Sequence, residues 1–398
     1  MMKQLKIKHI GAASLAALML LSLAACSNED DAATTQPAGK KLVMTAYNGE
    51  NEQSMTRGAH WEDNNTHTGG LSFHWDVAGN NQAGDELYDI YSMVITKDGT
   101  IGASWSTEPD KNFSIPYSSL KIELTGQPDK ATLTSRYYLD ASKHSAGNAI
   151  YCITPILNAP DPDIPNSFYK NLAMPTDFTQ AASGDAKHLK DYMYMTGTGT
   201  LKGETDQQLT SSDLYFKHIP ATIRIALTNQ RPEAATVTSI VMRETNGSKI
   251  FPNEKQWKCL MGTVTDENTR VSILEPTDKT GYTSSVTLNL TDANIAAEGK
   301  YYGYMLVLPQ DAEHALADKH LTFDITTQDG NTYTSFSMDA SELKKITKKQ
   351  NFVSGYVYTF NLTLNDKLTL SGVEVTTPSG STTPLPGWGT EDGETEIK

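Results

Sequence analysis

The chain has 398 residues and a formal net charge of −14. This length is enough for about two domains. The excess of acidic residues excludes binding to nucleic acid or to anionic lipid through the overall electrostatic field. No P-loop, GxGxxG, GxSxG or HExxH motif occurs, so these signatures of nucleotide binding, serine hydrolysis and zinc peptidases are missing. We expect no catalytic residue, no cofactor and no metal.

Residues 1–25 are predicted to be a signal peptide. Three lysines precede an apolar run that is too short to be read first as a membrane span and that ends in small residues. The small residues lead directly into Cys26, an order that looks like a lipobox, in which the cysteine is acylated and becomes the first mature residue. The alternative is an ordinary signal with an accidental cysteine. Because each buried methylene contributes about 0.8 kcal/mol, several chains such as palmitate on Cys26 would anchor an outer-membrane lipoprotein firmly.

Residues 26–40 are predicted to form a flexible, acidic tether. The run Glu29-Asp30-Asp31 lies just past the cysteine and resembles the export signal of surface lipoproteins in some anaerobic gut and oral bacteria. A solvated acidic spacer is the alternative interpretation. The rest of this stretch lacks apolar bulk, which is typical of a linker.

Alternation of apolar and polar residues with a period of two dominates the chain from residue 41 onward, which predicts an all-β fold. Strand candidates in the first half are 42–47, 86–95, 119–124, 131–139 and 149–157. The polar stretch 197–212 follows them. We place a domain boundary there, which gives an N-terminal domain at 41–205 and a C-terminal domain at 206–398.

The second half has the clearest strand signals. In Tyr356–Leu364 every second residue is large and apolar, and 301–308 is continuously apolar, as expected for a strand buried on both faces. Asp329-Gly330-Asn331 indicates a hairpin turn. Short helices are expected only at 340–346 and 291–297. Many short strands with turns between them predict antiparallel β-sandwiches.

Other candidate sites are weak. His60, His67 and His74 recur every seven residues, but no helix aligns them for a metal ion. Asp161 and Asp163 lie in a Pro-rich stretch that lacks the rest of a calcium loop. Cys152 and Cys259 allow a disulfide after export, and two separate buried thiols are the other interpretation.

Several segments resemble the fimbrillin family, the subunits of type V pili. The order and spacing of these segments carry the resemblance over nearly the whole chain, together with the lipobox. They are Thr56-Arg57 ahead of Phe73-x-Trp75, Leu214–Ile225 with Phe216 and His218, Tyr304–Gln310, Phe352–Phe360, and the tail 384–389 around Trp388.

The resemblance implies two transthyretin-like β-sandwich domains in tandem, no enzyme activity, and lipidation followed by export. It also implies cleavage by an Arg-specific protease in the loop after the first strand. Mapped onto this chain, that strand is 42–47 and the cut falls between Arg57 and Gly58. Loss of a strand leaves unpaired backbone groups that capture a strand from another chain.

Two C-terminal segments are candidates for the donated strand, one at 372–376 with Val373 and Val375 and one at 384–388 with Leu385 and Trp388. The partners implied are other fimbrial subunits, the outer membrane through the lipid on Cys26, and a host protein or glycan. The flexible stretch 377–383 and the acidic end 389–398 depart from the family pattern and leave stalk, tip and anchor subunits open. The alternative function is a monomeric surface lipoprotein that acts as an adhesin or binds glycans on the same fold.

Overall fold

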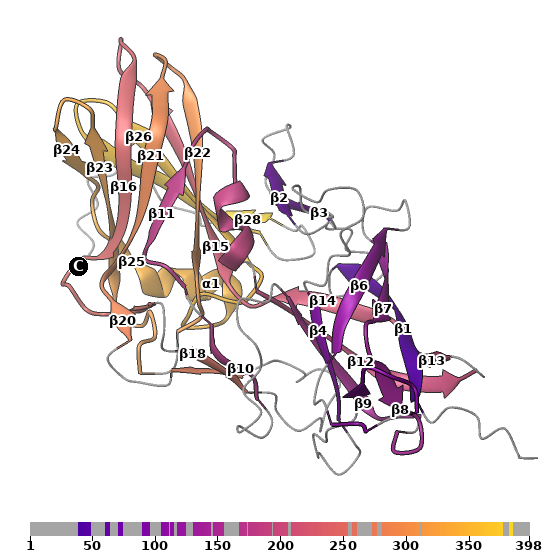
Figure 1. Cartoon of the computed structure of the whole chain (residues 1–398). Coiled ribbons are helices and arrows are strands. Elements are labelled where there is room, and N and C mark those ends of the chain that lie inside the picture. The colour runs from indigo at the N-terminus through magenta and orange to yellow at the C-terminus, as the bar shows by residue number, and fades with distance from the viewer. Residues whose placement is uncertain are drawn as a thin grey trace, which may run out of the picture. The chain divides into compact units, whose positions relative to one another are not determined.

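The computed structural model describes most of the chain from residue 39 onward (Figure 1). The described residues are 39–48, 60–63, 71–74, 90–95, 105–110, 112–114, 118–124, 130–144, 146–154, 167–172, 174–192, 194–205, 208–253, 257–260, 273–276, 281–310, 313–376 and 382–384. Regular structure in these ranges is almost entirely β, which confirms the predicted class. No helix within them is long and apolar enough to cross a bilayer.

The N-terminal strands form one large sheet. Ten described strands belong to it, in the order β13-β12-β9-β4-β6-β7-β1-β8-β5, with β14 beside β1 and β12. Their bounds are β1 (Gly39–Asn48), β4 (Ile90–Ile95), β5 (Trp105–Ser106), β6 (Ser118–Leu124), β7 (Lys130–Ser135), β8 (Tyr138–Asp140), β9 (Ala149–Thr154), β12 (Met195–Glu204), β13 (Gln208–Ser211) and β14 (Leu214–His218). Because β1 also pairs with β13 and β14, the pairing closes into a ring.

The C-terminal strands form two sheets that pack face to face. One has the order β11-β21-β16-β23-β24 with β25 beside β23, and the other has the order β22-β15-β26-β27-β28. Phe323 of β23 meets Phe360 of β26 with ring centroids 4.8 Å apart, so the two sheets enclose a common core. The bounds are β11 (Asp177–Gln180), β15 (Ala221–Asn229), β16 (Ala235–Glu244), β21 (Ser285–Ile295), β22 (Lys300–Val307), β23 (His320–Thr327), β24 (Thr332–Thr334), β25 (Met338–Asp339), β26 (Val357–Leu364), β27 (Leu368–Thr376) and β28 (Thr382–Pro384).

Smaller elements complete the described structure. They are the pair β2 (His60–Asp63) and β3 (Leu71–His74), the sheet of β10 (Ser167–Leu172), β18 (Trp257–Leu260) and β19 (Ile273–Pro276), the pair β17 (Phe251–Pro252) and β20 (Tyr282–Thr283), the 3₁₀ helices η1 (Lys187–Tyr192) and η2 (Ala340–Leu343), and α1 (Lys344–Thr347). The helix predicted at 340–346 is confirmed by η2 and α1.

The helix predicted at 291–297 is wrong. Residues 291–295 continue β21, where Ala293 pairs with Val237 and Ile295 pairs with Ala235 of β16. Both of these β21 side chains are buried. The neighbouring strand therefore overrides the local helical propensity of this stretch.

The sheets do not follow the predicted boundary at 205. β13 and β14 pair with β1 and β12, so the N-terminal sheet continues to His218. In the other direction, β11 pairs with β21 and adds residues 177–180 to the C-terminal sandwich. Ala38–Lys398 form one compact unit, and the division into two domains remains a prediction.

Candidate functional site

The first strand occupies a closing position in the N-terminal sheet. Along one edge β1 pairs antiparallel with β7, from Val43 opposite Thr134 to Tyr47 opposite Lys130. Along the other edge it pairs in parallel with β13 and then β14. β1 therefore lies between β7 and the pair β13 and β14, all of which come much later in the sequence.

The inner face of β1 belongs to the hydrophobic core. Leu42, Met44 and Ala46 are at most 2% exposed, and the residues between them are half-buried. Leu133 of β7 and Phe216 of β14 are fully buried on the flanking strands. Full burial of a leucine or methionine side chain contributes about 1.5–3 kcal/mol, so β1 is held by apolar contacts as well as by backbone hydrogen bonds.

Polar contacts fix the start of β1. The buried Lys40 donates from Nζ to the carbonyl oxygen of Thr205 at 2.9 Å and lies 3.3 Å from a carboxylate oxygen of Glu204. The backbone N–H of Leu42 donates to Oγ of Ser135 at 2.9 Å. These contacts tie the start of β1 to the end of β12 and to β7.

The predicted cleavage and lipidation residues lie outside the described residues. This holds for Cys26, Arg57 and Gly58, and also for Leu385 and Trp388. The segment with Arg57 joins the end of β1 at residue 48 to the start of β2 at residue 60. A cut there separates β1 from the rest of the chain.

The other donor candidates, Val373 and Val375, lie in β27. This strand is paired with β26 on one side and with β28 on the other. Both valines are buried, with at most 1% of their surface exposed. They are part of the core of this chain's own C-terminal sandwich.

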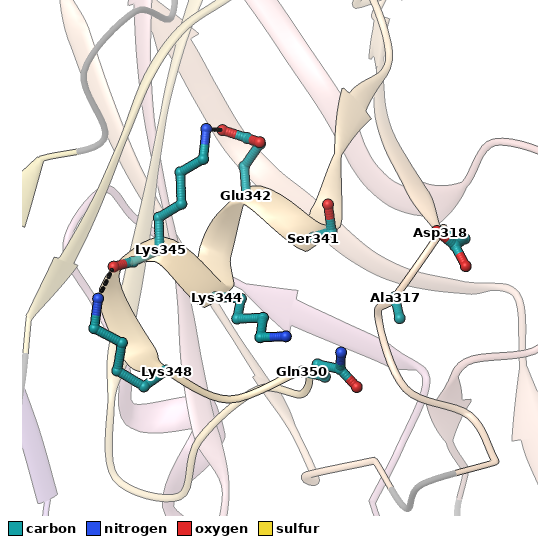
Figure 2. Close-up of a pocket in the computed structure, with 8 residues that line it drawn as sticks. All are labelled: Ala317, Asp318, Ser341, Glu342, Lys344, Lys345, Lys348 and Gln350. Atoms are coloured by element: carbon teal, nitrogen blue, oxygen red, sulfur yellow. Dashed lines mark hydrogen bonds and ion pairs between the residues drawn. The ribbon is translucent and has the colours of Figure 1, made fainter.

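A polar hollow of about 660 Å³ lies beside α1 (Figure 2). Lys345 donates to Glu342, and Nζ of Lys348 donates to the carbonyl oxygen of Lys345 at 2.8 Å. Lys344 points from the helix into the hollow (Figure 2). Lys345 and Lys348 are thus paired within the turn of the helix.

The histidines and cysteines of the sequence analysis gather no metal site among the residues that the structure describes. His60 and His74 are cross-strand partners at the open end of the β2–β3 hairpin, and His67 lies outside the described ranges. Cys152 is buried as a thiol in β9. Cys259 lies in β18, and Asp161 and Asp163 fall outside the described residues.

Gln180 and Arg224 are two of several polar residues buried in the C-terminal sandwich that the sequence analysis did not single out. Gln180 of β11 is fully buried and bonds to β22, which is an edge strand of the five-stranded sheet β22-β15-β26-β27-β28. Its side chain donates to the carbonyl oxygen of Tyr302 at 2.7 Å and accepts from the N–H of Tyr304 at 2.9 Å. Arg224 of β15 is the other. Only the interruption of an apolar strand pattern by an arginine could have signalled it.

Burial lowers the pKa of three histidines, His144, His188 and His218, and that of His218 falls to about 3. The unfolded chain takes up protons on these rings near pH 6.5 while the folded chain does not. A lowered histidine pKa therefore stabilises the fold above pH 6.5, and this stability is lost as the pH falls towards the folded pKa values. We predict that the thermal midpoint decreases steadily from pH 7 to pH 5, measured by circular dichroism.

Replacing His188 by glutamine provides the control for this pH dependence. Glutamine retains an N–H donor for the carbonyl oxygen of Tyr304, to which Nε2 of His188 bonds at 2.9 Å, and it does not titrate. The midpoint of His188→Gln should therefore fall less steeply over the same pH range. If the thermal midpoint fell equally steeply with pH in both proteins, His188 would not contribute to the pH dependence.

Comparison with known proteins gives the family. A family model described as fimbrillin-like matches residues 77–379, which is more than half of the chain. The chain belongs to the fimbrillin-like family. The resemblance stated from the sequence is thereby confirmed, and family membership supports a fimbrial subunit role at the cell surface without enzyme activity.

Solved structures similar to this fimbrillin-like chain share little sequence with it. A putative cell adhesion protein from Bacteroides ovatus is 14% identical, with 89% of this chain and 100% of that chain covered and a TM-score of 0.41. The tip fimbrial protein Mfa3 from Porphyromonas gingivalis, with a C-terminal truncation, is 11% identical (87% and 99% covered, TM-score 0.39). The fimbrial anchor protein Mfa2 from the same organism is 8% identical (87% and 99% covered, TM-score 0.36). No curated protein matches.

Proposed function

We propose that this chain is a structural or adhesive subunit of cell-surface fimbriae that is joined to its neighbours by strand exchange. In this proposal an Arg-specific protease cuts after Arg57, β1 leaves, and a strand of another subunit takes its place. The observation that supports it most is the pairing of β1, which closes the N-terminal sheet between β7 and the pair β13 and β14.

Loss of β1 would leave a groove suited to one kind of ligand. Its two sides would be strand edges with unpaired N–H and C=O groups, and its floor would include Leu133 and Phe216. An extended segment with apolar residues at alternate positions satisfies both requirements at once. Since many backbone bonds must break together to release it, such a joint suits a filament under tension.

Of the two donor candidates, the segment with Leu385 and Trp388 fits this proposal better. It follows Pro384, the last residue of β28, so donating it removes no described strand from the C-terminal sandwich. Donating Val373 and Val375 would pull β27 away from β26 and empty two core positions. Removal of such buried residues costs several kcal/mol.

Lipidation of Cys26 fits the same sequence of events. The lipid would hold the exported precursor at the outer membrane, and cleavage after Arg57 would release the rest of the chain from it. An anchor subunit would keep its lipid and stay uncut. N-terminal sequencing of the protein from cell surfaces distinguishes the two, since a start at Gly58 indicates a polymerising subunit and a blocked start at Cys26 an anchor or a monomeric lipoprotein.

Polymerisation is tested with an Arg-specific protease acting on the purified precursor. We predict that trimmed wild-type protein forms ladders that resist SDS at room temperature, because the exchanged strand is held along its whole length. Arg57→Gln should give no ladder. Arg270→Gln is the matched control, because Arg270 lies in another segment between strands, 261–272, and its replacement should leave the ladder intact. A wild-type chain that is cut after Arg57 and stays monomeric would contradict strand exchange.

A further inference from the structure

Arg224 is a buried cation with two nitrogens, Nε and Nη2, that donate no hydrogen bond. It lies in β15 with 3% of its surface exposed, and its Nε and Nη2 have no hydrogen-bond partner. Its one described contact is the ring of Tyr302, with the guanidinium carbon 4.5 Å from the ring centroid. A cation over a ring uses the face of the guanidinium and leaves the N–H groups in its plane free. A buried charge is costly unless it is paired, so a carboxylate that reaches Nε and Nη2 would relieve this cost.

The strand register shows what lies in line with Arg224. Arg224 is opposite Tyr304 on β22 and opposite Thr359 on β26. Thr359 is in turn opposite Glu374 on β27, and Glu374 is opposite Pro384 on β28. Residues paired in this way project from the same face of a sheet. One row of side chains therefore runs from Arg224 to the last described residue of the chain's C-terminal region.

The remainder of the chain starts at the end of this row. Fourteen residues follow Pro384, and they include four carboxylates between 391 and 396, namely Glu391, Asp392, Glu394 and Glu396. Arg224 and Pro384 are three strand spacings apart, which is about 14 Å. The seven residues from Pro384 to Glu391 extend to about 23 Å, so the acidic segment reaches Arg224 with chain to spare.

We propose that Arg224 binds a carboxylate of the acidic segment 391–396 of the same chain. The tail crosses the outer face of the five-stranded sheet and is held there by a charge-assisted, bidentate contact on Nε and Nη2. Length and charge both favour this occupant over a separate molecule. The contact belongs to the single chain before assembly, because donation of 384–388 to a neighbouring subunit would carry the acidic segment away from Arg224.

Two other ion pairs are alternatives to the proposed contact, one for Arg224 and one for the acidic tail. Glu374 lies in the same row, but its Oε1 accepts from Nδ2 of Asn361 at 3.3 Å. The lysines around the hollow beside α1, including Lys344, are an alternative target for the acidic tail (Figure 2). The experiment has to separate both from the proposed contact.

Carbodiimide coupling of an Arg224→Lys variant tests the proposal directly, because this reagent joins an amine to a carboxylate that touches it. We expect mass spectrometry of a digest to show residue 224 joined to one of the four tail carboxylates. Thr228→Lys is the matched control on the same strand and face, farther from the row, and should give no such product. A product that joins residue 224 to Glu374, or tail carboxylates coupled only to Lys344, Lys345 or Lys348, would overturn the proposal.

The same reaction on a mixture of isotope-labelled and unlabelled chains identifies the source of the tail. Coupled peptides of a single isotope composition are expected. Mixed peptides would place the tail of a second copy on Arg224 and overturn the contact within one chain.

A double-mutant cycle tests the wild-type arginine. The tail variant carries Glu391→Gln, Asp392→Asn, Glu394→Gln and Glu396→Gln, and it is compared with Arg224→Gln and with the combination. In low salt we expect the tail variant to raise the unfolding equilibrium constant about tenfold, the factor expected for loss of one charge-assisted hydrogen bond, and to change nothing in the Arg224→Gln background. Because the tail lies outside the described strands, its variant decides the question even where Arg224→Gln does not fold. A tail variant as stable as the wild type would contradict the contact.

Discussion

Replacing Phe360 by alanine is expected to lower the free energy of unfolding by about 4 kcal/mol, because a large buried ring is lost and the cavity closes only partly. Phe360 is fully buried in β26, and its ring lies 4.8 Å from that of Phe323 across the two sheets. Residues around it, such as Val373 and Ile225, sit on strands paired at both edges and have little freedom to collapse. Denaturant unfolding followed by fluorescence measures the change.

The same substitution at Phe336 is the control. Phe336 lies between β24 and β25 and is 74% exposed, so Phe336→Ala should change stability by less than about 0.5 kcal/mol. Similar losses for the two variants would mean that the two C-terminal sheets do not share the core described here.

The local pattern predicted much of the C-terminal sandwich. Alternation in 356–364 placed Tyr356, Tyr358, Phe360, Leu362 and Leu364 on one face, and the structure buries all of them except Tyr356, which is half-buried. The run 301–308 is buried throughout, as its continuous apolar character indicated. At the predicted hairpin, Gly330 has a φ of 84°, and a carboxylate oxygen of Asp329 accepts from the hydroxyl of Thr327. These features depend on neighbours in sequence, which is why periodicity and turn residues suffice.

Pairing between distant strands could not be predicted in the same way. The strand at 42–47 was expected, and it is β1. Nothing in its alternation indicates that it pairs in parallel with β13 and β14, because a strand edge offers the same backbone groups to any partner. Four pairings among the described strands are parallel, two of them made by β1. The boundary placed at 205 came from polar composition, and composition does not show which sheet a strand joins.

Polar residues inside the sandwich were missed for a related reason. A period of two predicts that Arg224, between Ile223 and Ile225, faces solvent. Both faces of β15 are buried at this point, so the arginine is enclosed. Whether a sheet is covered on its second face is decided by segments far away in the sequence. The site that we propose at Arg224 was therefore visible only in the folded chain.

Gln180→Ala is the second substitution with a large expected effect, about 3 kcal/mol of lost stability, because buried hydrogen-bonding groups lose their partner. The amide of Gln180 donates to the carbonyl oxygens of Ala182 and Tyr302 and accepts from the N–H of Tyr304. Without it, the carbonyl of Tyr302 retains the N–H of Gly184 at 2.9 Å, whereas the N–H of Tyr304 loses its bond to Oε1 of Gln180.

The loss of hydrogen bonds in Gln180→Ala is expected to act locally, at the edge strand β22. Together with Ser183 and His188, which bond to the N–H of Tyr302 and the carbonyl oxygen of Tyr304, it occupies the outer edge of β22. Hydrogen exchange should therefore show the amide of Tyr304 exchanging faster in Gln180→Ala than other β22 amides. Gln328→Ala, an exposed position in the turn after β23, is the control and should change neither stability nor exchange. Uniform acceleration along β22 would indicate a general loss of stability, and the edge of this sheet would then not depend on Gln180.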